Sequence, residues 1–229
     1  MAAGIVGAVA LFFILYRYDL VLMMLRYRWL GHEPRLLFNY VVGPLREFGQ
    51  PVSVAVALVL VIVYDRRWKR IVLTLVAAEL LAGAVLYTGK FTIERYRPFA
   101  AVEQWTDDPS YGAVEALAQH QPADTWIGLR PINWQRDWQS FPSGHSTGAF
   151  VLAGVLVRFY PELAVLLWTL AGGCAASRYV EALHWPSDCW AGAVLGYVAA
   201  RAALALFERR TPLPSTDADA GVRRLDIQT

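Results

Sequence analysis

The feature that most constrains this chain is a series of apolar segments that approach the length of a membrane-spanning helix. Crossing a bilayer takes about 20 mostly apolar residues, and a helix satisfies its backbone polar groups internally. The candidate segments are residues 4–16, 48–64, 71–89, 143–160, 163–177 and 185–206. We therefore predict an all-α, polytopic membrane protein with six transmembrane helices.

The composition agrees with this prediction. Only 17% of the 229 residues are charged, whereas soluble domains carry about 25%. The 9 Trp and 11 Tyr suit a membrane protein, because amphipathic rings collect at bilayer interfaces. A net charge of +2 gives no indication of nucleic-acid binding. Cys174 and Cys189 lie in apolar stretches without metal-type spacing, so we interpret both as packing residues.

The first apolar segment has two interpretations, a signal peptide or a first span. No basic region precedes residues 4–16, and the segment ends in Tyr-Arg-Tyr-Asp rather than in small residues. A cleavable signal needs a basic start and a small-residue cleavage site. We therefore predict a span.

The regions outside the spans differ in composition. Residues 17–47 mix apolar residues with five arginines, which is typical of amphipathic helices on the membrane surface. Residues 99–141 are predicted to form one long outer loop, whose tryptophans either border a lipid entrance or form an interface belt. Residues 209–229 are Pro-, Asp- and Thr-rich, as in a disordered cytoplasmic tail. Residues 1–208 then form a single membrane-embedded domain.

Basic residues predict the orientation. The short turn at residues 65–70 contains four Lys or Arg residues, which places it in the cytoplasm. Counting spans from there puts Arg209 and Arg210 in the cytoplasm too, in agreement. The arginines of residues 17–47 disagree, since the same count puts them outside; surface helices lying on anionic lipid would account for them. We predict a multi-pass protein of the plasma (inner) membrane.

Polar side chains gather where three apolar segments meet the predicted outer face. They are Lys90 and Arg97 after the third segment, Ser143, Gly144 and His145 at the start of the fourth, and Arg178, His184 and Asp188 between the fifth and the sixth. Because successive spans alternate in direction, all three clusters reach the same face of the membrane. We predict one site on the outer, periplasmic side.

The cationic and helix-start residues suit a phosphate. Lys90, Arg97 and Arg178 can neutralise phosphate oxygens, and the arginines offer bidentate contacts. If Ser143-Gly144 opens a helix, free N–H groups and the positive end of the helix dipole point at the anion. A basic residue at a span end is ordinarily an interface anchor, but these residues occur together on one face.

The two histidines and the aspartate suit group transfer. Pro186 fits the first turn of a helix, which leaves His184 just before that helix and Asp188 in its first turn. A carboxylate–imidazole hydrogen bond would then orient His184 as a nucleophile. His145 would be free to protonate the leaving oxygen. Asp188 alone would also be explained by the helix dipole.

Three motifs carry a resemblance to a known family. They read Lys90-x6-Arg97-Pro98, Pro142-Ser143-Gly144-His145 and Ser177-Arg178-x5-His184-x3-Asp188. This pattern resembles the three-part signature of the type 2 phosphatidic acid phosphatase and vanadium haloperoxidase superfamily, membrane branch. The resemblance implies His184 as nucleophile, Asp188 as its orienting partner and His145 as general acid. It also implies that Lys90, Arg97, Ser143, Gly144 and Arg178 hold the phosphate and that neither a metal nor a cofactor is needed.

The predicted function is hydrolysis of a lipid phosphate or pyrophosphate. Candidate substrates are polyprenyl pyrophosphate, phosphatidylglycerophosphate, phosphatidate and lipid A phosphates. A lipid phosphotransferase with an alcohol acceptor would use the same site, and the sequence does not separate the two. A haloperoxidase is disfavoured by the apolar spans, and a non-catalytic lipid binder by the complete set of reacting groups. Inside the first motif, Glu94 and Arg95 are expected to pair with each other or with the loop. Nothing in the sequence indicates an oligomeric state.

Overall fold

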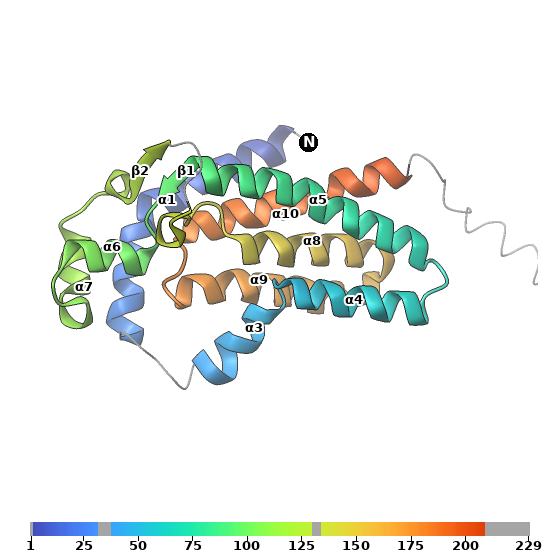
Figure 1. The fold of residues 1–229 in the computed structure, drawn as a ribbon, viewed down its shortest axis with the longest axis horizontal. Helices are drawn as coiled ribbons and strands as arrows, with labels where there is room; N and C mark the ends of the chain where they lie inside the picture. The colour runs from blue at the N-terminus through green and yellow to red at the C-terminus, as the bar shows by residue number, and fades with distance from the viewer. Residues whose placement is uncertain (1, 32–37, 130–133, 209–229) are drawn as a thin grey trace, which may run out of the picture.

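Six helices occupy the positions of the six predicted spans (Figure 1). The structure is a computed structural model and describes residues 2–31, 38–129 and 134–208. The six helices are α1 (Ala2–Leu30), α4 (Pro51–Tyr64), α5 (Trp68–Thr92), α8 (Gly144–Phe159), α9 (Ala164–Val180) and α10 (Pro186–Glu208). The predicted all-α membrane fold is confirmed. The predicted tail, residues 209–229, lies outside the described residues.

The helices differ in whether each can cross a membrane alone. Among the described residues, α1, α5, α9 and α10 lie in helices that are long and apolar enough to span. Helix α4 reaches that length only together with the preceding segment Tyr40–Glu47, from which it is bent by 61°. Helix α8 has 16 residues, fewer than the roughly 20 that a perpendicular span needs. Six crossings therefore stay a prediction.

Helix α8 packs closely against α10 because α10 carries glycines at the contact. A Cβ atom on Gly192 would lie 2.4 Å from the backbone oxygen of Ser143, and one on Gly196 would lie 2.2 Å from that of Thr147. Small residues four apart let two helix backbones approach in lipid, where packing rather than the hydrophobic effect drives association. This contact fixes the start of α8 against the first turns of α10.

The prediction of separate surface helices within residues 17–47 was wrong for its first half. Residues 17–30 continue α1 without a break, so α1 has 29 residues. Arg26 is buried, and it donates hydrogen bonds to the backbone oxygens of Val180 and Gly31 at 2.8 Å each. Because its charge is satisfied within the protein, this arginine does not argue against the predicted orientation. A π-helical turn (Phe38–Val42) and α3 (Gly43–Glu47) follow.

The predicted outer loop is instead a folded cap. After β1 (Ile93–Arg95) come α6 (Pro98–Trp105) and α7 (Pro109–Ala118), and β2 (Trp126–Leu129) returns antiparallel to β1. Short 3₁₀ turns lie at Pro122–Thr125, Arg136–Trp138 and, between α8 and α9, Pro161–Leu163.

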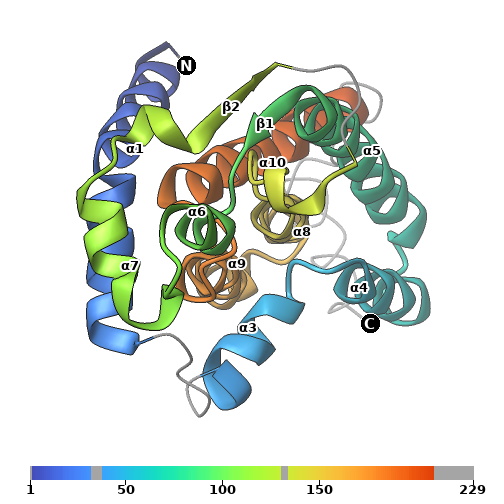
Figure 2. The same ribbon diagram turned by 60° about the vertical axis from the view of Figure 1, so that its left-hand side comes forward.

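The cap is held by an apolar core that it shares with α1. Figure 2 shows α7 lying along α1, and Leu20 and Met23 of α1 share a buried cluster with Val102, Leu117 and Trp185. Apolar side chains of α6 and α7, such as Val102 and Leu117, therefore pack inward, which a polar loop would not allow. The cap attaches the outer helix α1 to the end of the bundle where α10 begins.

Candidate active site

A pocket of about 610 Å³ opens at the end of the bundle where α5 ends and α8 and α10 begin. Six of the eight predicted site residues line it, namely Lys90, Arg97, Gly144, His145, Arg178 and His184. The other two, Ser143 and Asp188, are fully buried beside lining residues. The alternation of span directions thus brings all three sequence clusters to one end of the molecule.

Three cations of the pocket are held by protein oxygens. Lys90 Nζ donates to the backbone oxygen of Gln139 at 2.9 Å, and Arg97 Nε donates to that of Arg136 at 2.9 Å. Arg178 is buried and pairs with Glu181 one turn later on the chain. Burial and the neighbouring Arg136 lower the pKa of Arg97, yet a guanidinium keeps its proton at neutral pH. The result is a concentrated positive charge at fixed positions.

The predicted helix start is confirmed at α8. Ser143 is the residue before the first helical residue, Gly144, and its extended backbone turns the chain into the helix. Ser146 Oγ donates to Ser143 Oγ at 3.0 Å, and the Ser143 N–H donates to the backbone oxygen of Asp188 at 3.1 Å. The first turn of α8 therefore lies beside the pocket, and the positive end of the helix dipole is on the same side as the cationic side chains.

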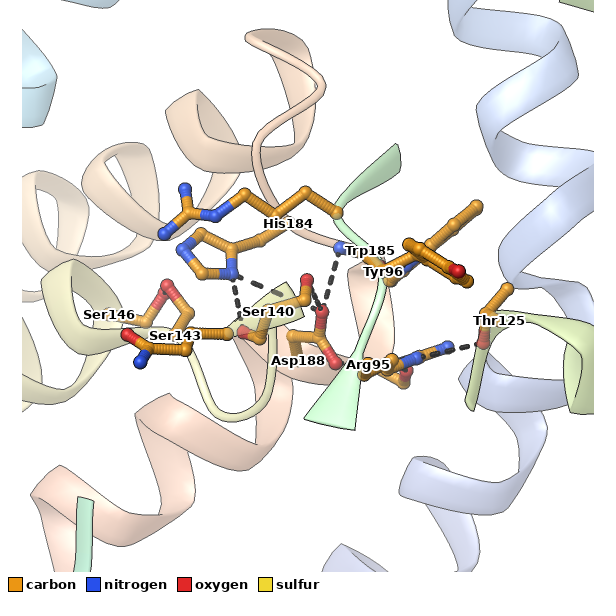
Figure 3. A network of polar contacts seen from close by, with 12 residues as sticks. Arg95, Tyr96, Thr125, Ser140, Ser143, Ser146, His184, Trp185 and Asp188 are labelled. Atoms are coloured by element: carbon orange, nitrogen blue, oxygen red, sulfur yellow. Dashed lines mark hydrogen bonds and ion pairs between the residues drawn. The ribbon is translucent and has the colours of Figure 1, made fainter. Parts of the chain in front are cut away.

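His184 lies between α9 and α10 and is almost entirely buried. Its Nδ1 lies 2.7 Å from the backbone oxygen of Ser140 (Figure 3). A carbonyl oxygen only accepts, so this bond assigns the proton to Nδ1 and leaves the Nε2 lone pair free. Burial, and then the charges of Lys90, Arg97 and Arg178, hold the pKa of His184 well below its ordinary value of 6.5. The imidazole is neutral at pH 7 and carries the lone pair that a nucleophile needs.

The predicted hydrogen bond between Asp188 and His184 is not formed. Asp188 Oδ2 lies 4.0 Å from His184 Nδ1, beyond hydrogen-bond length. It accepts instead from Ser140 Oγ at 2.5 Å and from the Trp185 N–H at 3.1 Å. The spacing prediction put Asp188 in the right place but missed that the Ser140 backbone takes the imidazole N–H.

A buried network behind Asp188 was not found by sequence reasoning. Arg95 pairs with Asp188 and, at 2.7 Å, with Asp19 of α1. The expectation that Arg95 pairs with Glu94 or the loop therefore missed its main partners, although Arg95 Nε does donate to Thr125 of the cap at 3.0 Å. A signal was available, because an aspartate inside a predominantly apolar helix is costly unless it has a partner.

Further lining residues carry no motif that sequence reasoning could have used. Arg136 and Asp137 are exposed on a short turn of the cap, whereas Tyr87, Phe99 and Leu183 give part of the wall an aromatic and aliphatic character. One tryptophan of the cap, Trp126, packs over the Arg95 guanidinium at 4.6 Å. Trp126 therefore packs against the buried network behind Asp188 and is not among the residues that line the pocket.

The fold and the pocket define a class of protein: a helical membrane protein with a pocket lined by cationic side chains at one end of its bundle. Among the described residues, no group of three or more His, Cys, Asp or Glu side chains is arranged to hold a metal ion. The cationic side chains that line the pocket are Lys90, Arg97, Arg136 and Arg178.

Comparison with known proteins gives the family. Residues 71–212 match the sequence profile of the PAP2 superfamily. The match covers more than half of the chain and contains all eight predicted site residues, so the chain belongs to the PAP2 superfamily and to its phosphoric ester hydrolases. No protein of curated function matches the sequence.

Two solved structures show the same fold. The crystal structure of Aquifex aeolicus LpxE is similar with a TM-score of 0.56 and 19% identity, over 81% of this chain and 94% of that one. The transmembrane PAP2 type phosphatidylglycerolphosphate phosphatase from Bacillus subtilis is similar with a TM-score of 0.55 and 17% identity, over 91% of this chain and 98% of that one. At these identities the likeness establishes the arrangement of the helices.

Proposed function

We propose that this membrane phosphatase hydrolyses a lipid phosphate or pyrophosphate through a phosphohistidine intermediate on His184. The observation that carries the proposal is the orientation of His184. Its Nδ1 is bonded to the Ser140 carbonyl, and the ring lines a pocket together with His145 and four cationic side chains. A neutral imidazole held in this way presents Nε2 as a nucleophile.

The reaction has two steps. The Nε2 lone pair of His184 attacks phosphorus, and the bond from phosphorus to the leaving oxygen breaks while His145 protonates that oxygen. A water molecule then attacks the phosphorus, His145 takes its proton, and the P–N bond breaks to regenerate His184. One residue thus acts first as acid and then as base, which requires His145 and His184 to face one pocket, as they do.

The remaining residues of the signature hold the phosphoryl group. Lys90, Arg97 and Arg178 offset the negative charge of the transferring group, and the backbone N–H groups at the start of α8 supply further donors. Asp188 orients the Ser140 segment that holds His184, and it balances the positive charge that develops on the imidazole. Because side-chain cations carry the charge, we expect EDTA to leave turnover unchanged and vanadate to inhibit it.

A lipid substrate follows from where the pocket lies. Lys90 is in the last turn of α5, and His145 and Asp188 are in the first turns of α8 and α10. Headgroup phosphates lie at such helix ends, and the apolar wall residues Tyr87 and Phe99 suit the first part of a lipid chain. Polyprenyl pyrophosphate, phosphatidylglycerophosphate and phosphatidate are the candidate classes.

The substrate test compares lipid with soluble phosphates that share a leaving group. Turnover would be measured in mixed micelles at matched bulk concentration, with His184→Ala as the blank. We expect kcat/KM to be much higher for the long-chain substrate, because each methylene that leaves water contributes about 0.8 kcal/mol. Equal efficiency on glycerol phosphate would agree with a phosphatase activity but would contradict the assignment of a lipid substrate.

We also place the pocket on the outer, periplasmic face of the membrane. Support comes from the basic turn between α4 and α5, at the opposite end of the bundle from the pocket (Figure 1). A cysteine replacing the exposed Tyr111 of the cap should react with an impermeant maleimide in spheroplasts, and one replacing Lys69 should not. Cys174 and Cys189 are buried, so background labelling should be low. The reverse pattern would put the pocket in the cytoplasm.

A further inference from the structure

Arg95 is a fully enclosed cation that lies outside the signature residues. Its guanidinium has no solvent exposure, and it donates to Asp19 Oδ2 at 2.7 Å and to Asp188 Oδ1. It also donates to Ser187 Oγ at 2.8 Å and to Thr125 Oγ1 at 3.0 Å. Elements far apart in the sequence, namely α1, β1, the cap and α10, therefore meet at one side chain.

The surrounding residues keep Arg95 charged and shield it from solvent. The rings of Tyr16, Trp126 and Trp185 surround its guanidinium carbon at 5.7, 4.6 and 5.4 Å. Burial works against the charge, but the carboxylates of Asp188 and Asp19 outweigh it and raise the pKa of Arg95. A buried ion pair gives little net stability compared with apolar packing. Stability alone is therefore a weak explanation of this pair, and its contacts indicate what else it does.

The contacts lead from Arg95 to His184 through two residues, Asp188 and Ser140. Arg95 binds Oδ1 of Asp188, which leaves Oδ2 to accept the Ser140 hydroxyl at 2.5 Å. The backbone oxygen of the same Ser140 lies 2.7 Å from His184 Nδ1 (Figure 3). The Asp188 carboxylate is thus held at one oxygen by Arg95 while the other oxygen holds the residue that orients the imidazole.

Asp19 brings α1 into this arrangement. Its Oδ1 accepts the Ser187 N–H at 3.0 Å, and its Oδ2 accepts from the Ser187 hydroxyl and from Arg95. Asp19 therefore holds both Arg95 and the first turn of α10, the turn that carries Asp188. Asp19 also lies outside residues 71–212, the part of the chain that matches the family.

We propose that Asp19 and Arg95 form a positioning pair that keeps the His184 imidazole in its attacking orientation by way of Asp188 and Ser140. The side chains of Asp19 and Arg95 do not line the pocket, so the pair acts through other residues. It rests on the proposed role of His184 as nucleophile. It also gives α1 a function: the outermost helix completes the support of the reacting group.

The test measures kcat, KM and the inhibition constant of inorganic phosphate for Arg95→Gln and Asp19→Asn. Misplacement of a reacting group by about 1 Å costs on the order of 10²-fold in rate, so we expect a loss of that size in kcat. KM and phosphate inhibition should stay close to wild type, because Lys90, Arg97 and Arg178 are untouched. Asp65→Asn, which breaks an arginine–aspartate pair at the other end of the bundle, is the matched control and should keep wild-type kcat.

A double-mutant cycle separates positioning from general destabilisation. If Arg95 acts through Asp188, Arg95→Gln should add little further loss to Asp188→Asn. Additive losses in kcat, or an unchanged kcat in folded Arg95→Gln, would overturn the proposal. A parallel rise in the phosphate inhibition constant would show a collapsed pocket, which also contradicts it.

Arg95→Gln leaves two carboxylates buried without their cation, so this variant could fold poorly. A second variant keeps the proposal testable in that case. Asp19→Asn/Arg95→Gln removes one of those charges, and its kcat should be as low as that of the folded single variants. The outcome also separates the two proposals. Turnover by His184→Ala would refute the nucleophile, whereas an inactive His184→Ala with a fully active Arg95→Gln would refute the positioning pair alone.

Discussion

The two ends of the bundle each hold an arginine bonded to an aspartate, and the pairs differ in their surroundings. At the pocket end, Arg95, Asp19 and Asp188 are completely buried. At the other end, Arg67 is 54% exposed and lies 2.9 Å from Asp65, which also accepts the Tyr160 hydroxyl at 2.7 Å. Water and salt screen the exposed pair, whereas the enclosed one keeps its directionality.

The same two residue types therefore serve different purposes at the two ends. The Arg67–Asp65 pair closes the short turn between α4 and α5, where several geometries would serve. The Arg95 network fixes which carboxylate oxygen faces Ser140, and the attacking orientation tolerates little variation.

The largest effect is expected for His184→Ala at the pocket end. Removing a nucleophile from a group-transfer enzyme costs roughly 10⁶-fold in kcat, and no neighbouring side chain of the pocket replaces its Nε2. Turnover of the best lipid phosphate should fall to the blank, while the helical circular dichroism spectrum and the elution volume stay unchanged. Residual turnover within a few-fold of wild type would mean that the attacking group lies elsewhere.

His145→Ala should have the second largest effect. Loss of a general acid costs about 10²–10⁴-fold, and the cost depends on how much the leaving oxygen needs a proton. We therefore expect a large loss on an alkyl phosphate and a much smaller one on a nitrophenyl phosphate. Equal losses on the two substrates would show that His145 binds the phosphate instead of protonating the leaving group.

The pH profile should show a smaller effect from the charges around His184. Because the pKa of the buried His184 imidazole lies well below 6.5, this imidazole stays unprotonated as the pH falls through 6.5. After correction for substrate ionisation, the acid limb of kcat/KM should therefore lie below pH 6.5. Lys90→Met removes one positive neighbour, which eases protonation and should move that limb to higher pH. A limb at or above pH 6.5 in the wild type would contradict a depressed pKa.

The smallest effect is expected for Asp65→Asn at the opposite end. An exposed ion pair contributes about 1 kcal/mol or less, so thermal unfolding should shift slightly and kcat should not change. High salt should reduce the difference in stability between wild type and variant, because it screens exposed charges. A loss of turnover would show that the two ends are coupled through the bundle and would weaken the comparison.

The sequence predicted much of the site because its signals are local. The motifs at Lys90, His145 and His184 lie at ends of apolar segments, and the alternation of spans brings those ends together. The Asp19–Arg95 pair was missed because its members are 76 positions apart and no spacing rule joins them. Likewise, the four-residue spacing of His184 and Asp188 predicted proximity, but it could not show that Ser140, from a third segment, takes the imidazole N–H.

The fold shows the same contrast between local sequence signals, which could be used for prediction, and contacts between distant segments, which could not. Long apolar segments predicted the helices of the bundle, since length and hydropathy suffice for a span. They did not predict the cap, whose helices α6 and α7 are short and are stabilised by contacts with α1 rather than by their own composition. Nor did they predict that α1 continues to Leu30, because its Asp19 and Arg26 resemble surface residues until their buried partners are known.

Chemical trapping of the phosphohistidine intermediate would test the proposed role of His184 most directly. Wild-type enzyme would be mixed with a radiolabelled lipid phosphate and quenched in alkali, in which a phosphohistidine survives, and the protein would be digested and mapped. We expect label on the peptide that contains His184 and none on His184→Ala. Substrate consumption by the wild type without any label on that peptide, or label on His184→Ala, would contradict it.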